Sequence, residues 1–244
     1  MLKGIAASSG IVISKVFKLE HPVMNIVKED ISDVDVEIAK LQKAIEYSCN
    51  DINIIKEKAT GRLSAEELAI FDAHLMVAED PELMSQVTDM IKNDKVNASY
   101  ALEQVANMFI SIFESMEDAY MRERAADIKD VTYRIKAHLL GLKLPDLSLI
   151  DEEVIVVAHD LTPSDTAQLN KKFAKGFATE IGGRTSHSAI MARSLEIPAV
   201  VGVSGILEAV KADDIIVLDA IKGEVVLSPS EAEIAEYKKQ ADNF

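Results

Sequence analysis

The chain has 244 residues, which is long enough for two domains, and 48 % of them are hydrophobic, which is ample for packed cores. A formal net charge of −15 and the absence of tryptophan argue against binding of a nucleic-acid backbone or stacking on bases. The acidity instead favours a basic partner, or it only keeps the protein soluble.

The cysteine content and the N-terminal stretch bear on the compartment. Cys49 is the only cysteine, so no disulfide can form within the chain, which is typical of a reducing compartment. Glycine and serine interrupt the apolar run at the N-terminus, which is unlike a signal peptide and too short for a membrane span. We therefore expect a cytoplasmic protein without a membrane segment.

The first 20 residues predict β-structure. Ile11–Ile13 and Val16–Phe17 are apolar and are flanked by glycine and serine, which is typical of one or two strands joined by a turn. Such a short piece is not stable alone, so these strands must pair with strands further along the chain.

Residues 32–141 predict a helical bundle, because apolar residues recur at helical spacing and the segments between helices are short. A capping box of Ser64 and Glu67 opens the second helix, Asp80 followed by Pro81 opens the third, and Asn97 caps the fourth region. The expected helices cover residues 33–58, 64–76, 81–93 and 97–140, with a kink or break near Met116–Tyr120.

Residues 146–229 predict an α/β layer, because short strands alternate with helices. The expected strands cover residues 154–158, 176–180, 199–203, 215–219 and 224–227. A last helix in residues 230–244 forms a C-terminal linker. The fold class is therefore mixed: residues 1–20 and 146–229 form an α/β domain, and the helical block 32–141 is inserted into it.

The stretch Gly182–Arg193 carries the chemistry. Two glycines end an apolar strand, and a helix-forming run follows at Ser188–Leu195, with His187 at the junction. Unpaired amides and the positive end of the helix dipole form an anion site there, and Ser186 or Thr185 can cap the helix. The positive end also disfavours imidazolium, so a neutral imidazole with a free lone pair can act as a nucleophile.

Taken by itself, the histidine pattern is also compatible with a packing or capping residue. The run GGRTSHSAIMARSLEIPAVVG in residues 182–202, however, closely resembles the phosphohistidine motif of enzyme I of the bacterial phosphoenolpyruvate:sugar phosphotransferase system. The related dikinases carry a cysteine at the position of Ser186, and the opening residues 4–10 also resemble the start of enzyme I.

The resemblance implies a swivelling phosphohistidine α/β domain with an inserted helical bundle that docks the carrier protein HPr. It implies an enzyme that passes phosphoryl from phosphoenolpyruvate through His187 to HPr, the first step of sugar uptake by this system. The resemblance also implies that a phosphoenolpyruvate-binding, dimerising domain, with its Mg²⁺, follows Phe244 in the intact enzyme. We therefore expect a monomeric fragment of a homodimeric enzyme, with no metal or cofactor of its own, that exchanges phosphate reversibly with phospho-HPr.

The resemblance also assigns residues. It makes His187 the phosphoryl carrier and Thr166 the residue that orients its imidazole. The residues themselves add that the guanidinium fork of Arg184 fits phosphate oxygens, and that the turn and helix start form a phosphate cradle of Gly182, Gly183, Thr185, Ser186 and Ser188. The HPr-binding face comprises Glu66, Glu67, Asp72, His74, Met76, Val77, Asp80 and Arg124.

Simpler interpretations stay open for several of these residues. Arg184 is equally compatible with a solvated arginine, Arg193 with a structural ion pair, and Met76 with the core of the bundle. Val77 and Ala78 are smaller than the leucines that the family carries there. The alternative functions are a phosphohistidine domain of a dikinase-like enzyme and a non-enzymatic helical interaction module.

Overall fold

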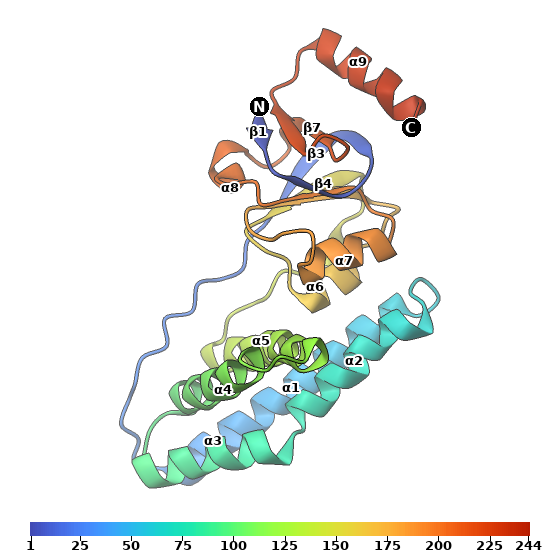
Figure 1. Ribbon diagram of the computed structural model, residues 1–244. Coiled ribbons are helices and arrows are strands. Elements are labelled where there is room, and N and C mark those ends of the chain that lie inside the picture. The colour runs from blue at the N-terminus through green and yellow to red at the C-terminus, as the bar shows by residue number, and fades with distance from the viewer. The chain divides into compact units, whose positions relative to one another are not determined.

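The computed structural model describes residues 1–244 and divides the chain into two compact units. One unit comprises Met1–Glu20 and Pro145–Phe244, and the other comprises His21–Leu144. The chain thus leaves the first unit, forms the second, and returns to the first (Figure 1).

The first unit is built on one sheet of eight strands. The strands are β1 (Leu2–Lys3), β2 (Ile5–Ser8), β3 (Ile11–Leu19), β4 (Val154–Ala158), β5 (Ala174–Thr179), β6 (Ala199–Val201), β7 (Ile215–Asp219) and β8 (Glu224–Leu227). They are ordered β1-β8-β7-β3-β4-β5-β6-β2. Strands β3 to β6 are parallel, and the other neighbours pair antiparallel. The residues before 20 form three strands rather than the one or two that were predicted, and each of them pairs with a later strand, as expected.

Helices cover both faces of this sheet. Helices α6 (Pro163–Gln168) and α7 (His187–Ser194) contact each other (Figure 1). Helix α7 packs Ala189 and Ala192 into a hydrophobic cluster with Val156 and Phe177. The opposite face holds Ile155, Val157 and Ile206 of α8 (Ile206–Ala209). A 3₁₀ turn covers Leu147–Leu149, and α9 (Glu231–Asp242) contacts β3. Strand β4 is entirely buried because both of its faces are covered, which explains its uninterrupted apolar sequence.

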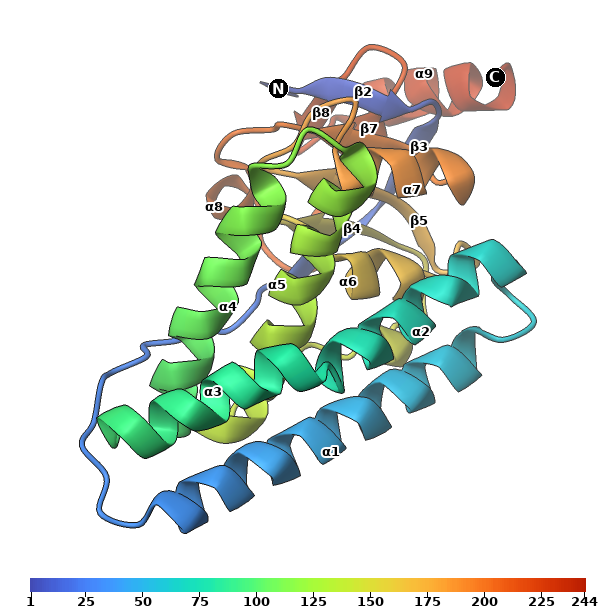
Figure 2. The same cartoon turned by 60° about the horizontal axis from the view of Figure 1, so that its bottom comes forward.

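The second unit is a bundle of five helices (Figure 2). They are α1 (Val34–Ala59), α2 (Ala65–Ala78), α3 (Pro81–Asp94), α4 (Ala98–Glu114) and α5 (Ala119–Leu140). Helices α4 and α5 lie side by side, and α1 contacts α2, α3, α4 and α5. The expected interruption near Met116 is confirmed: Asp118 caps α5 by accepting a hydrogen bond from Tyr120 N at 2.9 Å. None of the helices has the length and apolarity to span a bilayer.

The start of α4 differs from the prediction. Asn97 occupies the cap position, but its side chain accepts no hydrogen bond from a backbone amide of the helix and contacts α4 only by donating from Nδ2 to Ser99 Oγ at 3.0 Å. Its Oδ1 accepts from Glu29 N at 2.8 Å and its Nδ2 donates to Val27 O at 2.9 Å, so it binds the backbone of the segment before α1. The buried Glu37 of α1 caps α4 instead, because its Oε2 accepts from Ala98 N at 2.9 Å. Sequence periodicity cannot reveal a cap that comes from another helix.

Glu37→Ala should lower the free energy of unfolding by about 1–3 kcal/mol, because it leaves a buried amide without its acceptor. The measurement is urea unfolding monitored by circular dichroism. The matched control is Glu46→Ala, an exposed glutamate on the same helix, which should change stability by about 0.5 kcal/mol or less. Equal effects of the two substitutions would contradict the proposed cap.

Candidate functional site

The loop that precedes His187 lies at the carboxyl ends of the parallel strands. It follows β5, and the ends of β4 and β6 flank it in the sheet. Glu180 joins these elements: its Oε1 lies 3.0 Å from His159 Nδ1, just after β4, and its Oε2 accepts from Leu207 N of α8 at 3.4 Å. Ligands of open α/β sheets bind at this edge, so the topology places His187 where a site is expected.

Ser186 closes the loop and begins the helix. Its Oγ donates to Gly183 O at 2.7 Å and accepts from Ala189 N at 3.3 Å, and its own amide donates to Gly183 O at 3.0 Å. The two open choices for the cap thus resolve to Ser186, and Thr185 stays exposed. Both predicted glycines lie in the turn, but only Gly182 has a positive φ, of 116°. A Cβ at Gly182 would also meet Ser186 Oγ at 3.2 Å, whereas one at Gly183 would enter open space.

His187 is the first residue of α7, one residue earlier than the predicted helix start. The residue as a whole is half-buried, whereas the ring atom Nε2 is buried. The amides of the first turn are not equivalent: Ala189 N bonds to Ser186 Oγ and Ile190 N bonds to Ser186 O. The cap does not engage the amide of Ser188, whose side chain is buried. The predicted cradle is therefore narrower than a whole first turn and centres on the amides at the very start of α7.

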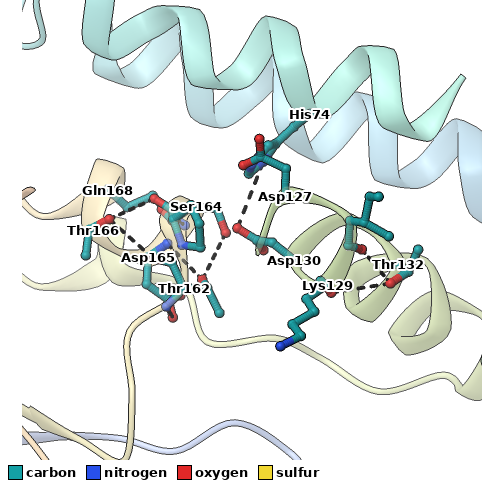
Figure 3. Close-up of polar contacts among 12 residues, drawn as sticks. His74, Asp127, Lys129, Asp130, Thr132, Thr162, Ser164, Asp165, Thr166 and Gln168 are labelled. Atoms are coloured by element: carbon teal, nitrogen blue, oxygen red, sulfur yellow. Dashed lines mark hydrogen bonds and ion pairs between the residues drawn. The ribbon is translucent and has the colours of Figure 1, made fainter. Parts of the chain in front are cut away.

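Thr166 lies on α6, the helix that contacts α7. A capping box of Thr162 and Asp165 opens α6 (Figure 3). The Thr166 hydroxyl is buried and donates to Pro163 O at 2.9 Å, so its proton is already used and its oxygen remains an acceptor. A role in orienting His187 would therefore require the imidazole to donate to this oxygen.

The two arginines of the motif differ in their contacts. The Arg184 side chain is exposed, and its backbone carbonyl oxygen accepts a hydrogen bond from Arg193. Arg193 forms no ion pair, contrary to the simpler expectation: Nη2 donates to Arg184 O at 2.8 Å and Nη1 donates to Ala7 O of β2 at 3.0 Å. The sequence offered one signal for this contact, a basic residue in the last turn of the helix, but no signal for its partners.

The helical unit corrects part of the predicted HPr face. His74 and Val77 are 1 % and 6 % exposed, so neither lies on the surface. Val77 belongs to the bundle core, and His74 Nε2 contacts Asp127 Oδ1 of α5 at 3.0 Å (Figure 3). The resemblance to enzyme I placed these residues on the HPr-binding face, but the sequence could not show that α5 covers part of it.

The remaining residues of that face are more accessible. Met76 is 66 % exposed, which excludes a core role, and Glu66 is exposed. Asp72 forms an exposed ion pair with Lys56 at 2.6 Å. Glu67 completes the capping box of α2, Asp80 caps α3, and Arg124 lies over the Tyr120 ring at 6.0 Å. No group of three or more His, Cys, Asp or Glu side chains in the chain is placed to hold a metal ion.

The comparisons with known proteins follow this division of the chain. Residues 3–124 match the family model for the N-terminal part of PEP-utilising enzymes, and residues 150–223 match the model for their mobile domain. The chain therefore belongs to the PEP-utilising enzymes. It is similar over its whole length to enzyme I: an enzyme I protein solved by NMR has a TM-score of 0.90 and 48 % identity, covering 100 % of this chain and 99 % of that one.

Curated relatives give the same family. The phosphoenolpyruvate-protein phosphotransferases of Priestia megaterium and Latilactobacillus sakei are 52 % and 55 % identical, each over 100 % of this chain. The chain spans 42 % of the length of either relative. The N-terminal domain of an Enzyme 1 - Nitrogen protein, at 23 % identity and a TM-score of 0.62, shares the fold.

Asp127→Asn should reduce stability in a pH-dependent way. Burial disfavours the charged imidazole, but the bond to Asp127 and the charges of Asp130 and Asp127 outweigh burial and the opposing charge of Arg134, so the pKa of His74 is raised. The stabilisation is fully present below the unfolded pKa of about 6.5 and is lost as the pH rises through the raised folded pKa.

The difference in free energy of unfolding between the wild type and Asp127→Asn should therefore be largest near pH 6, at about 1 kcal/mol or more. It should shrink at alkaline pH. Urea unfolding across this pH range measures it. Asp89→Asn, which changes an exposed carboxylate on α3, is the control and should show no such slope. A difference that grows with pH would contradict the assignment.

Proposed function

We propose that His187 accepts a phosphoryl group and passes it to a histidine of HPr, with phosphoenolpyruvate as the donor in the longer protein. The observation that carries the proposal is the placement of His187 as the first residue of a capped helix, at the carboxyl edge of the sheet. Membership in the PEP-utilising enzymes supports it, and so do the curated relatives named phosphoenolpyruvate-protein phosphotransferases.

The chemistry is a pair of phosphoryl transfers. A neutral imidazole nitrogen of His187 attacks phosphorus, a P–N bond forms, and the P–O bond to the enol oxygen breaks as the enolate of pyruvate leaves. The phosphorylated ring gives up its N–H proton, and the enolate takes up a proton at carbon to become pyruvate. In the second transfer the P–N bond on His187 breaks while one forms on the HPr histidine. Because both acceptors are imidazoles, the second step is reversible. The protein supplies position and electrostatic stabilisation, which dominate the catalysis of phosphoryl transfer.

The cradle residues act on the charge of the transferred group. The Ser188 amide lies at the start of α7, which is the positive end of the helix dipole, and both favour an anion there. The exposed Thr185 hydroxyl and Arg184 guanidinium can reach a phosphoryl oxygen from the loop. Thr166 would hold the imidazole by accepting its N–H, leaving the other ring nitrogen as the nucleophile.

The HPr contact is proposed for the accessible part of the face on α2. Glu66, Asp72 and Asp80 bring negative charge around the exposed Met76, a suitable surface for a basic partner with an apolar centre. His74 and Val77 support this surface from within the bundle.

The wider context belongs to the same proposal. We infer a cytoplasmic enzyme at the first step of sugar uptake by the phosphotransferase system, homodimeric through the part of the longer relatives that lies outside this chain. Mg²⁺ bound in that part would neutralise phosphoenolpyruvate charge. The 244-residue chain alone should exchange with phospho-HPr but should not react with phosphoenolpyruvate.

His187→Ala should abolish labelling of the chain by phospho-HPr, because the acceptor nitrogen is lost. Radiolabelled phospho-HPr, mixed with each variant and resolved on gels under alkaline conditions that preserve phosphohistidine, measures the transfer. His159→Ala removes another histidine of the same sheet edge and is the control, with labelling expected at the wild-type level. Thr166→Val should slow the transfer without abolishing it. Equal labelling of the wild type and His187→Ala would refute the proposal.

Glu66→Lys should weaken HPr binding, because it reverses a charge on the accessible face. We expect a loss of roughly three- to thirtyfold in affinity at low salt, shrinking as salt screens the charge. Titration of the chain with HPr, followed by amide NMR, measures it. Glu46→Lys makes the same change on α1, outside the face, and should leave the affinity near the wild-type value. A similar loss in both variants would show that only net charge matters.

A further inference from the structure

The guanidinium of Arg193 joins two segments that lie far apart in the sequence. It donates to Ala7 O of the edge strand β2 and to Arg184 O of the loop before His187, at 3.0 and 2.8 Å. We propose that Arg193 is a positioning residue of the phosphoryl site, which holds the loop backbone in the conformation that receives phosphate. The proposal rests on the function proposed for His187.

The residue type and its place on α7 fit this role. Side chains of a helix lean toward its N-terminus, so an arginine in the last turn can reach back to the loop that begins the helix. The planar guanidinium presents several N–H groups in a fixed fork and can bind two carbonyls at once, whereas a lysine ammonium is a single point of charge. The charged donor also makes these bonds stronger than neutral ones.

The bond to Arg184 O fixes the direction of an amide. The peptide group is planar and trans, so the C=O of Arg184 and the N–H of Thr185 point in opposite directions. While Arg193 holds the carbonyl, the Thr185 amide must point away from the guanidinium. Ser186 holds the preceding carbonyl of Gly183 in the same way, through its Oγ at 2.7 Å. Two successive carbonyls of the loop are thus tied back, so neither is free to turn toward an incoming anion.

A second bond between β2 and α7 gives a matched control. Ser8 Oγ donates to Ala192 O at 3.4 Å, so it joins the same strand to the same helix without touching the loop. Loss of the Ser8 bond tests attachment of the helix to the strand, and loss of the Arg193 bonds tests attachment plus loop geometry. A role confined to general stability predicts similar behaviour of the two changes.

The experiment compares wild type, Arg193→Met, Arg193→Lys and Ser8→Ala. The rate of phosphoryl transfer from phospho-HPr is measured together with the amide signal of Thr185 and the imidazole nitrogen signals of His187 in the unphosphorylated protein. We expect both Arg193 variants to slow transfer roughly ten- to a hundredfold, as misplaced reacting groups do, and to shift those signals. Ser8→Ala should keep the wild-type rate and signals.

Three results would overturn the proposal: wild-type rates and signals in Arg193→Met, full rescue by Arg193→Lys, or an equal loss in Ser8→Ala. The first would show that the loop does not need the Arg193 hydrogen bonds, and the second that a positive charge at this position is sufficient. The third would show that the rate depends only on attachment of the helix to the strand. If the wild type itself takes no label from phospho-HPr, the function proposed for His187 fails, and the signals of Thr185 still decide whether Arg193 sets the loop backbone.

Discussion

The site depends on one capping interaction at the start of α7, the hydrogen bond that the Ala189 N–H donates to Ser186 Oγ. The same hydroxyl donates to Gly183 O, so a single side chain both begins the helix and closes the turn before it. The positive φ of Gly182 lets the chain enter that turn, and a Cβ there would press on Ser186 Oγ. Together these contacts put His187 at the positive end of a helix, with the residue half-buried and its Nε2 atom buried.

The sheet makes this loop depend on both ends of the chain. Strand β2 pairs with β6, and β3 pairs with β4 and β7, so the first 20 residues complete a sheet whose other strands begin at Val154. Arg193 and Ser8 add side-chain bonds between β2 and α7. The helical unit between these segments has its own core, which includes Leu41, Leu102 and Ile135. An insertion of this size is tolerated because the ends of the inserted block need only meet the connecting segments of the sheet domain.

Local signals explain what could be predicted from the sequence. The caps at Ser64 and Asp80, the apolar run Val154–Ala158 and the glycine turn before His187 each depend on residues close together in the chain, so their elements are found where the pattern indicates them. The motif around His187 likewise lies in one continuous stretch. The break between α4 and α5 was also visible, since Asp118 can open a helix by itself.

Long-range partners explain what could not be predicted. The Glu37 cap of α4, the Arg193 bonds to Ala7 and Arg184, and the contact of His74 with Asp127 join segments whose meeting has no local signature. The same limit produced an HPr face that was too broad. The resemblance to enzyme I placed His74 and Val77 on the same face as Met76, but only packing shows that the first two are buried.

The most direct test of the central claim is to phosphorylate the chain with phospho-HPr and record its phosphorus and amide NMR spectra. The account predicts one acid-labile phosphoryl group on a nitrogen of His187, with a large change of the Ser188 amide signal. The amides of Ala189 and Ile190 should change less, because both remain bonded to Ser186. A phosphoryl group on another residue, or a first turn of α7 whose amides do not respond, would contradict it.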